Sequence, residues 1–171
     1  GLSSTVNKMN SQDIYNLDVQ NKCFEKAVNY CYITFEIHVL CMVNKQLSLR
    51  NDKKIISSCM KKRYIYSSSG EILVIQQDCS NWLFCIRDYE NNNGSIKMKI
   101  VIYPGNGEEW RVRAMPEPGF VTRIKLKSKD ELLELDKSLE GKITFVHNAG
   151  FIGGAKTLED AVKMANLCLS S

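Results

Sequence analysis

The sequence predicts an α+β fold. Helices come first, an antiparallel β-meander follows, and a helix, a strand, a glycine-rich loop and a last helix complete a mixed sheet. Apolar residues recur at three- and four-residue steps between positions 24 and 42, which is the period of a helix that buries one face. Apolar and charged residues alternate between 96 and 115, which indicates strands. An apolar run at 143–146 is followed by glycines and then by an amphipathic helix that opens at Thr157.

The helical period predicts two helices near the start of the chain. The first carries the stripe between 24 and 42, and further apolar residues beside this stripe indicate that it is covered on more than one side. The second covers 49–60, with Ser48 as a possible cap. A later helix is expected after Ser128, because Ser128 and Glu131 have the spacing of a capping box.

The β structure is expected to begin at residue 63. The predicted strands are a hairpin at 63–66 and 71–77, a third strand at 82–88, and a fourth and fifth at 96–103 and 109–115. The last two must turn their apolar residues to the core together, so a loop of odd length that pairs Ile102 with Trp110 is predicted. This register gathers a basic strip on one face, made of Lys97, Lys99, Arg111 and Arg113.

Composition limits the class of protein. A chain of 171 residues is long enough for one well-buried domain, and its apolar runs are far too short to span a bilayer. Its seven cysteines include no Cys-x-x-Cys pair, which argues against zinc and a disulfide framework and predicts a reducing, intracellular compartment. A net charge of +4 permits contact with phosphate without requiring it. Lys125, Lys127 and Lys129 alternate, and solvated surface is the plainer interpretation of them.

Several segments resemble one known family in the order in which that family has them. Residues 145–154, FVHNAGFIGG, are similar to the carboxy-terminal signature of the Myg-type family of the DHH phosphoesterase superfamily, which are metal-dependent nucleases. Residues 108–123 resemble the family's Trp-Arg strand, and 24–35 resemble its long helix. The matching positions are Phe24, Ala27, Phe35, Trp110, Arg111, Pro116, Phe120 and Arg123, with a further likeness at 6–10.

The resemblance implies a role within a larger enzyme. The family's catalytic half carries His- and Asp-rich motifs that hold metal ions, Mn²⁺ or Mg²⁺, whereas this chain has only His38 and His147. We therefore expect no metal ligands or catalytic residues here, with residues 1–20 as a linker from a missing N-terminal catalytic domain and 21–171 as a carboxy-terminal substrate-binding domain. The implied activity is 3′–5′ exonuclease action on RNA or a related nucleotide, with this chain inactive alone. The implied location is the nucleus or mitochondrion.

The glycine-rich segment is the predicted binding site. Amides at Gly150, Gly153 and Gly154, together with His147 and Lys156, are expected to hold a substrate phosphate. Arg111, Arg113 and Arg123 are expected to add positive charge, because arginine pairs bidentately with phosphate. The alternative is a tight connection in which the glycines only supply positive φ. Two other functions stay open: a non-catalytic nucleic-acid or protein interaction module, and a phosphoesterase for small nucleotides.

Overall fold

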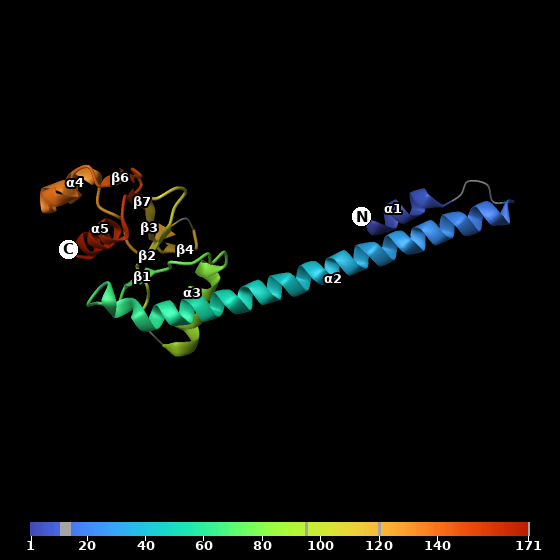
Figure 1. The fold of residues 1–171 in the computed structure, drawn as a ribbon, viewed down its shortest axis with the longest axis horizontal. Helices are drawn as coiled ribbons and strands as arrows, with labels where there is room; N and C mark the ends of the chain where they lie inside the picture. The colour runs from blue at the N-terminus through green and yellow to red at the C-terminus, as the bar shows by residue number, and fades with distance from the viewer. Residues whose placement is uncertain (11–14, 95, 120, 171) are drawn as a thin grey trace. The chain divides into compact units, whose positions relative to one another are not determined.

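The computed structural model describes residues 1–10, 15–94, 96–119 and 121–170 (Figure 1). The chain forms two compact units, Gly1–Ser48 and Leu49–Ser171, and each is described by itself. The predicted α+β class is confirmed, since the second unit holds a mixed five-stranded sheet with helices packed on it. The predicted division into 1–20 and 21–171 stays a prediction.

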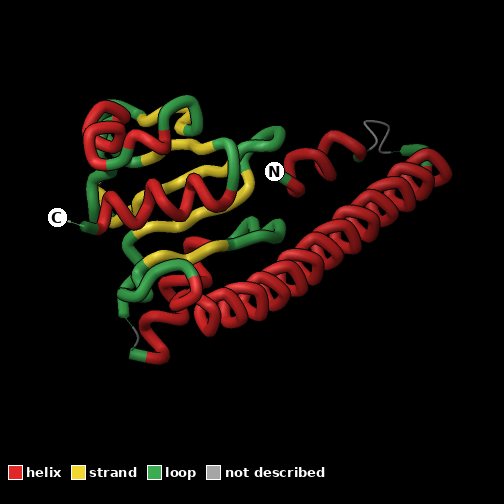
Figure 2. The backbone as a smooth tube through the Cα atoms, turned by 60° about the vertical axis from the view of Figure 1, so that its left-hand side comes forward, coloured by secondary structure: helices red, strands yellow, loops and turns green. Residues whose placement is uncertain are grey.

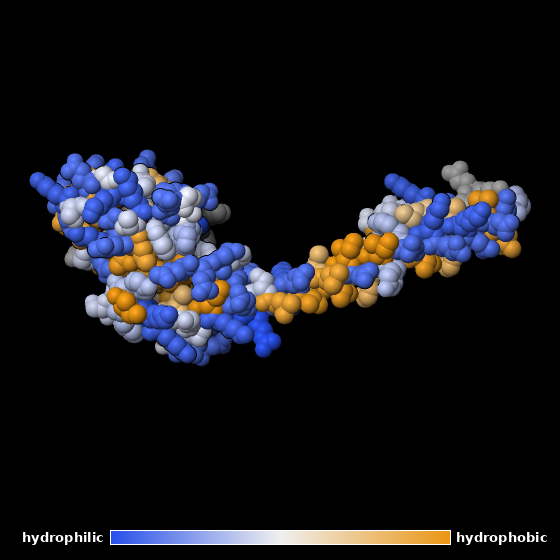
Figure 3. All heavy atoms as spheres, in the orientation of Figure 1, coloured by the Kyte–Doolittle hydropathy of each residue, from blue (hydrophilic) through white to orange (hydrophobic). Residues whose placement is uncertain are grey.

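The first unit is helical. Helix α1 (Leu2–Met9) and the first turn of α2 (Leu17–Lys62) occupy much of the predicted linker. The helix over 24–42 is confirmed, but its predicted cover is missing: among the described residues of this unit, Ala27 alone is a buried hydrophobic residue. Phe24 and Phe35 are each 68% exposed, and apolar side chains gather along the middle of α2 (Figure 3).

Helix α2 continues to Lys62, so the predicted boundary at Ser48 is wrong. A serine caps a helix only where the preceding backbone is not helical, and no glycine or proline interrupts residues 17–62. The predicted hairpin at 63–77 is also wrong. Residues Arg63–Ile65 form a short 3₁₀ turn, η1, and Ile72–Val74 form strand β1, which is buried throughout.

The predicted third strand at 82–88 is helix α3 (Trp82–Asn93). Trp82, Cys85, Ile86 and Tyr89 follow the i, i+3, i+4, i+7 spacing of a helix and pack in one apolar cluster. The helix also explains the topology. It joins β1 to β2 (Ile100–Pro104), and two parallel neighbouring strands require such a crossover.

The sheet has the order β1-β2-β3-β7-β6, in which only β1 and β2 are parallel. Its other members are β3 (Trp110–Ala114), β7 (Ile152–Ala155) and β6 (Ile143–Val146). Ile102 pairs with Val112, so apolar residues share a face as predicted, although the partner is two residues beyond Trp110. The odd loop length is confirmed, because Pro104 pairs with Trp110 and leaves 105–109 as the connection.

Helices cover both faces of the sheet. Helix α5 (Leu158–Leu169) lies across one face, as Figure 2 shows, and α4 (Lys129–Leu135) and η2 (Lys137–Leu139) extend that layer. The predicted capping box of Ser128 and Glu131 is confirmed at the start of α4. Ile56 and Met60 of α2 and Ile86 of α3 fill the opposite face near β1 and β2. Strands β4 (Pro116–Glu117) and β5 (Val121–Thr122) form a small separate sheet.

Candidate functional site

The predicted glycine loop is divided between a turn and a strand. Gly153 and Gly154 lie in β7, which pairs with β3 on one side and β6 on the other. Their backbone therefore belongs to the sheet rather than to an anion cradle at a helix entrance, and the connection from β6 is a turn at 147–151. The predicted strand–loop–helix unit is a β-hairpin followed by α5.

Close packing explains both glycines of β7. A Cβ on Gly153 would lie 2.5 Å from the Met164 Cε of α5 and 3.1 Å from the Phe145 carbonyl oxygen. A Cβ on Gly154 would lie 2.5 Å from Thr144 Oγ1 and 2.8 Å from the Phe145 ring. Neither glycine has positive φ. They are needed for interstrand and helix–sheet contact, which is a different requirement from the turn geometry that the alternative interpretation supposed.

Gly150 has the left-handed conformation that favours glycine, with φ of 67°. Its amide donates to the His147 carbonyl at 2.7 Å, and its own carbonyl accepts from the Leu126 amide at 2.8 Å. A Cβ here would lie 2.4 Å from Lys125 Cγ and 2.8 Å from the Leu126 carbonyl oxygen. Gly150 thus lets the 147–151 turn dock directly on the segment that carries three alternating lysines.

This docking encloses a hollow of about 360 Å³, which we call the lysine pocket. Its lining consists of Lys125, Leu126, Lys127, Ser128, Lys129, Asp130, Glu131, Val146, His147 and Asn148. Among the described residues, none of the three lysines forms an ion pair. Lys127 Nζ donates to the Ser170 carbonyl at 2.8 Å, which positions its charge without neutralising it.

The pocket also contains two carboxylates. Glu131 accepts hydrogen bonds from the Ser128 hydroxyl at 2.7 Å and the Ser128 amide at 2.6 Å, and these bonds hold the pKa of Glu131 below its usual value. That carboxylate is therefore committed to the helix cap. With three lysines against Glu131 and Asp130, the lining keeps an excess of positive charge.

His147 is oriented for donation into solvent at the pocket. Its Nδ1 accepts from the Ala149 amide at 3.1 Å, and its ring packs on Phe151 with centroids 4.4 Å apart. Because Nδ1 is the acceptor, the proton of the neutral ring is assigned to Nε2. His147 is exposed, so Nε2 can donate to an anion held by the lysines.

Three other predicted site residues lie outside the lysine pocket. Arg111 pairs with Glu109 at 2.6 Å and lies over the Phe145 ring at 4.9 Å, across the space that Gly154 leaves open. Arg113 lies 6.0 Å from the centre of the Trp82 ring. Lys156 is exposed at the end of β7, and its amide donates to the Lys142 carbonyl. The basic strip is therefore partly neutralised, since Lys99 also pairs with Glu71 at 2.7 Å.

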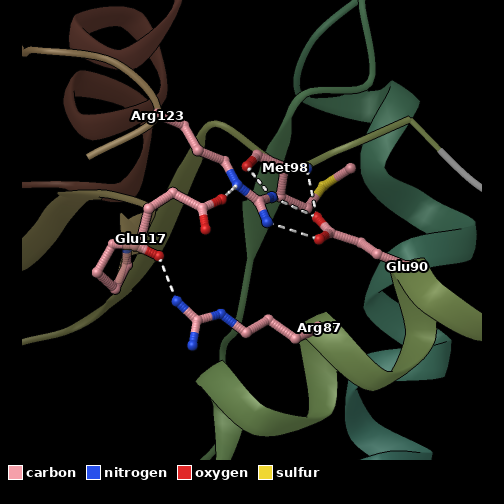
Figure 4. Close-up of polar contacts among 6 residues, drawn as sticks. Arg87, Glu90, Met98, Glu117 and Arg123 are labelled. Carbon is pink, nitrogen blue, oxygen red and sulfur yellow. Dashed lines mark hydrogen bonds and ion pairs between the residues drawn. The ribbon is translucent and has the colours of Figure 1, made fainter. Parts of the chain in front are cut away.

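Arg123 is occupied by partners within the fold (Figure 4). Its guanidinium donates to both carboxylate oxygens of Glu90 at 2.7 and 2.9 Å, to the Met98 carbonyl at 2.8 Å, and to Glu117. The side chains of Arg123 and Glu90 are 11% and 4% exposed. The hydrogen bonds that Arg123 donates to Glu90, followed by the one it donates to Glu117, raise the pKa of Arg123. The structure places this arginine in a buried ion-pair network between α3 and the segment after β5, and its contact with a phosphate stays a prediction. Phe120 lies outside the described residues.

The described residues form no metal centre. In the described ranges, no group of three or more His, Cys, Asp or Glu side chains is placed to hold a metal ion. Over the same ranges, no helix is both long enough and apolar enough to cross a membrane. What the geometry defines is an α+β domain with a lysine- and histidine-lined pocket suited to an anion.

The chain belongs to the MYG1 exonuclease family, described as "Uncharacterised protein family (UPF0160)", whose model matches residues 1–169. It is 31% identical to a protein named MYG1 exonuclease from Rattus norvegicus over 69% of this chain and 33% of the relative. It is 31% identical to the MYG1 protein of Dictyostelium discoideum over 86% of this chain and 46% of the relative. It is 27% identical to a Caenorhabditis elegans MYG1 protein over 98% of this chain and 52% of the relative.

The chain thus spans between a third and about half of the length of these relatives. No solved structure matches it significantly. The Myg-type family that the sequence resembled is therefore established, and several of its curated relatives carry the name exonuclease. Sequence reasoning named His147 and Gly150 but took the three lysines for solvated surface. Their alternation with a buried Leu126 was the available signal, and its meaning depends on the turn that folds against it.

Proposed function

We propose that this chain is the substrate-binding, carboxy-terminal part of a metal-dependent 3′–5′ exonuclease that acts on RNA or a related phosphodiester. The proposal is carried by the convergence of Lys125, Lys127 and Lys129 on His147 in one hollow. Ammonium groups supply charge to a phosphate, and the imidazole N–H and the Asn148 side chain supply hydrogen-bond donors. The names of the mammalian relatives add that the family includes exonucleases.

In this proposal the metal ions, Mn²⁺ or Mg²⁺, belong to another part of the whole protein, a missing N-terminal catalytic domain. Bound metal would activate water and stabilise the displaced oxygen. The residues of this chain orient the phosphate. Their charge alone does not distinguish between the possible phosphate-containing substrates. The chain by itself should release no nucleotides from single-stranded RNA in the presence of Mn²⁺. Turnover that persists through rigorous purification would place catalysis here instead.

The pocket is tested by binding of uridine monophosphate to the chain, measured calorimetrically. Lys125→Gln together with Lys129→Gln should weaken binding about tenfold or more, because each removes a charge from the phosphate site. The matched control, Lys97→Gln with Lys137→Gln, removes the same charge from exposed positions outside the pocket and should leave affinity unchanged. Equal effects in the two double variants would mean that the lysines act through the overall charge of the chain and not as a phosphate-binding pocket.

Glycine substitutions provide a second test, because they separate the docked turn from the strand. Gly150→Ala introduces both positive-φ strain and a backbone clash. Gly107→Ala is the control for strain alone, because it has positive φ and no atom within 4 Å of the new Cβ. Gly154→Ala should lower stability by about 1 kcal/mol or more and leave affinity intact. Gly150→Ala should lose both stability and affinity. Intact nucleotide binding by a folded Gly150→Ala chain would refute the assignment.

The two other candidate functions give different results. A small-nucleotide phosphoesterase would bind the mononucleotide as tightly as an oligonucleotide, since the lysine pocket alone would recognise it. A non-catalytic interaction module would bind nucleic acid or a protein while the full-length protein showed no metal-dependent turnover.

A further inference from the structure

The end of α2 carries a second concentration of positive charge within the Leu49–Ser171 unit. Arg50, Lys54, Ser57 and Lys61 follow one another at steps of four, three and four residues, which places them on a single stripe of the helix. With Lys53 and Ser58 they border an open hollow of about 460 Å³, and no carboxylate contributes to its lining. We call these six residues the basic helix face.

Most of this charge is unpaired. Arg50, Lys54 and Lys61 are exposed, and within the described ranges none of them forms an ion pair. Lys53 is different, because it pairs with Asp88 at 3.0 Å. The acidic residue of the same helical segment, Asp52, is 3% exposed and accepts bonds from the Asn81 amide and side chain at 2.9 and 2.8 Å. Its charge is thus committed to holding the start of α3.

The chemistry of the lining favours a phosphate backbone over a lipid surface. Helices that lie on membranes place exposed apolar side chains beside their cations. Here the residues beside the cations are serines, and the neighbouring apolar residues Ile56 and Met60 are fully used by the core. Serine hydroxyls together with lysine and arginine are the groups that contact nucleic-acid phosphates. No aromatic side chain lines the hollow itself, but the exposed ring of Phe84 lies beside it, with its centre 5.6 Å from Lys53 Nζ. A single ring can stack on any base, so it adds no sequence preference.

We propose that the basic helix face binds the backbone of a nucleic-acid strand without sequence preference, as a second contact for the substrate of the lysine pocket. This rests on the proposed function for the identity of that substrate. Residues 50 to 61 extend about 16 Å along the helix at ~1.5 Å per residue, enough to follow several phosphates.

The two surfaces lie on different sides of the domain. The end of α2 packs on the sheet face near β1, whereas the lysine pocket adjoins β6 and α4 in the opposite layer (Figures 1 and 2). β1 and β6 are the two edges of the five-stranded sheet, about 19 Å apart at ~4.8 Å per strand. A mononucleotide in the lysine pocket cannot reach the basic helix face. A strand that passes around the domain can contact both.

The test compares uridine monophosphate with a fluorescein-labelled uridine RNA of about 20 nucleotides, longer than typical single-domain sites. The triple variant Arg50→Gln, Lys54→Gln, Lys61→Gln should bind the RNA more weakly. The slope of log affinity against log salt should flatten by about 2, since each lost phosphate contact on a single strand contributes about 0.7. Its affinity for uridine monophosphate should stay unchanged. The control, Lys26→Gln, Lys97→Gln, Lys137→Gln, removes equal charge and should leave the slope as in the wild type.

Each failure has a separate meaning. An unchanged salt slope in the triple variant, or an equal change in the control, would overturn the basic helix face. If the wild-type chain does not bind uridine monophosphate, but the triple variant still flattens the salt dependence of RNA binding, the lysine pocket is refuted and the basic helix face is supported. Binding to phosphatidylserine vesicles that the triple variant abolishes, without an effect on RNA, would assign the face to a membrane and refute the proposal.

Discussion

Replacing Arg123 with methionine tests whether this arginine stabilises the fold or binds substrate. The variant removes the ion-pair partner of Glu90, whose side chain is 4% exposed in the wild type, and leaves the Met98 amide at 2.7 Å as the one other hydrogen-bond donor to it among the described residues. Removing one member of a buried, hydrogen-bonded ion pair costs about 3–5 kcal/mol, because the other charge is left without compensation. For a unit of this size the loss corresponds to a fall in melting temperature on the order of 10–20 °C.

Glu117 provides the internal comparison, since it contacts the same guanidinium from a side chain that is 35% exposed. Solvent screens that contact, so Glu117→Gln should cost no more than about 1 kcal/mol. The double variant Arg123→Met with Glu90→Gln should recover part of the loss, because the amide removes the unpaired charge and keeps an acceptor for the Met98 amide.

Urea unfolding at neutral pH, followed by circular dichroism, measures these differences. The reasoning from burial is refuted if the losses in free energy of unfolding from Arg123→Met and Glu90→Gln simply add in the double variant. It is also refuted if Arg123→Met costs no more than Glu117→Gln. Nucleotide affinity of the folded variant, taken well below its melting point, is the second readout. A large loss of affinity with stability preserved would return Arg123 to the substrate site that the sequence suggested.

Two predictions concern titration. The hydrogen bonds from Lys163 and then Ser138 lower the pKa of Asp136 to about 2, so its contribution to stability is present above its ordinary pKa of 3.8 and is lost as pH falls toward 2. Urea midpoints of wild type and Asp136→Asn should therefore converge over that range. Burial, followed by the nearby Asp52 charge, raises the pKa of Cys79 to about 12. Iodoacetamide at pH 8 should label exposed Cys41 well before Cys79, as read by mass spectrometry.

The parts of the fold that sequence predicted correctly are those decided by neighbours in the chain. The capping box at Ser128 needs only two residues three positions apart, and the facing of β2 and β3 follows from alternation across one loop. The error at 82–88 had a local cause as well. Strand and helix were both compatible with its apolar residues, and the helical spacing that extends to Tyr89 was the stronger signal.

The burial of the helix over 24–42 was a different kind of prediction. Its period identifies which side chains share a face, and the helix has that period. The period does not identify the partner that covers the face. Val28, Ile33 and Leu40 remain exposed among the described residues, which is unusual for a contiguous apolar surface. A pattern within one helix therefore predicts which side chains share an apolar face. Whether that face is buried depends on the rest of the protein.

The binding site depends on contacts that no local pattern contains. Lys125 and His147 are far apart in the chain, and they meet because Gly150 adopts positive φ and its carbonyl accepts the Leu126 amide at 2.8 Å. The sequence gives Gly150, Gly153 and Gly154 equal standing as glycines beside a strand. Their environments separate them: one permits a turn to dock, and two permit close packing of β7 against its neighbours. A glycine motif predicts that backbone approaches something closely, and the tertiary structure decides whether that neighbour is a ligand, a lysine-bearing segment or another strand.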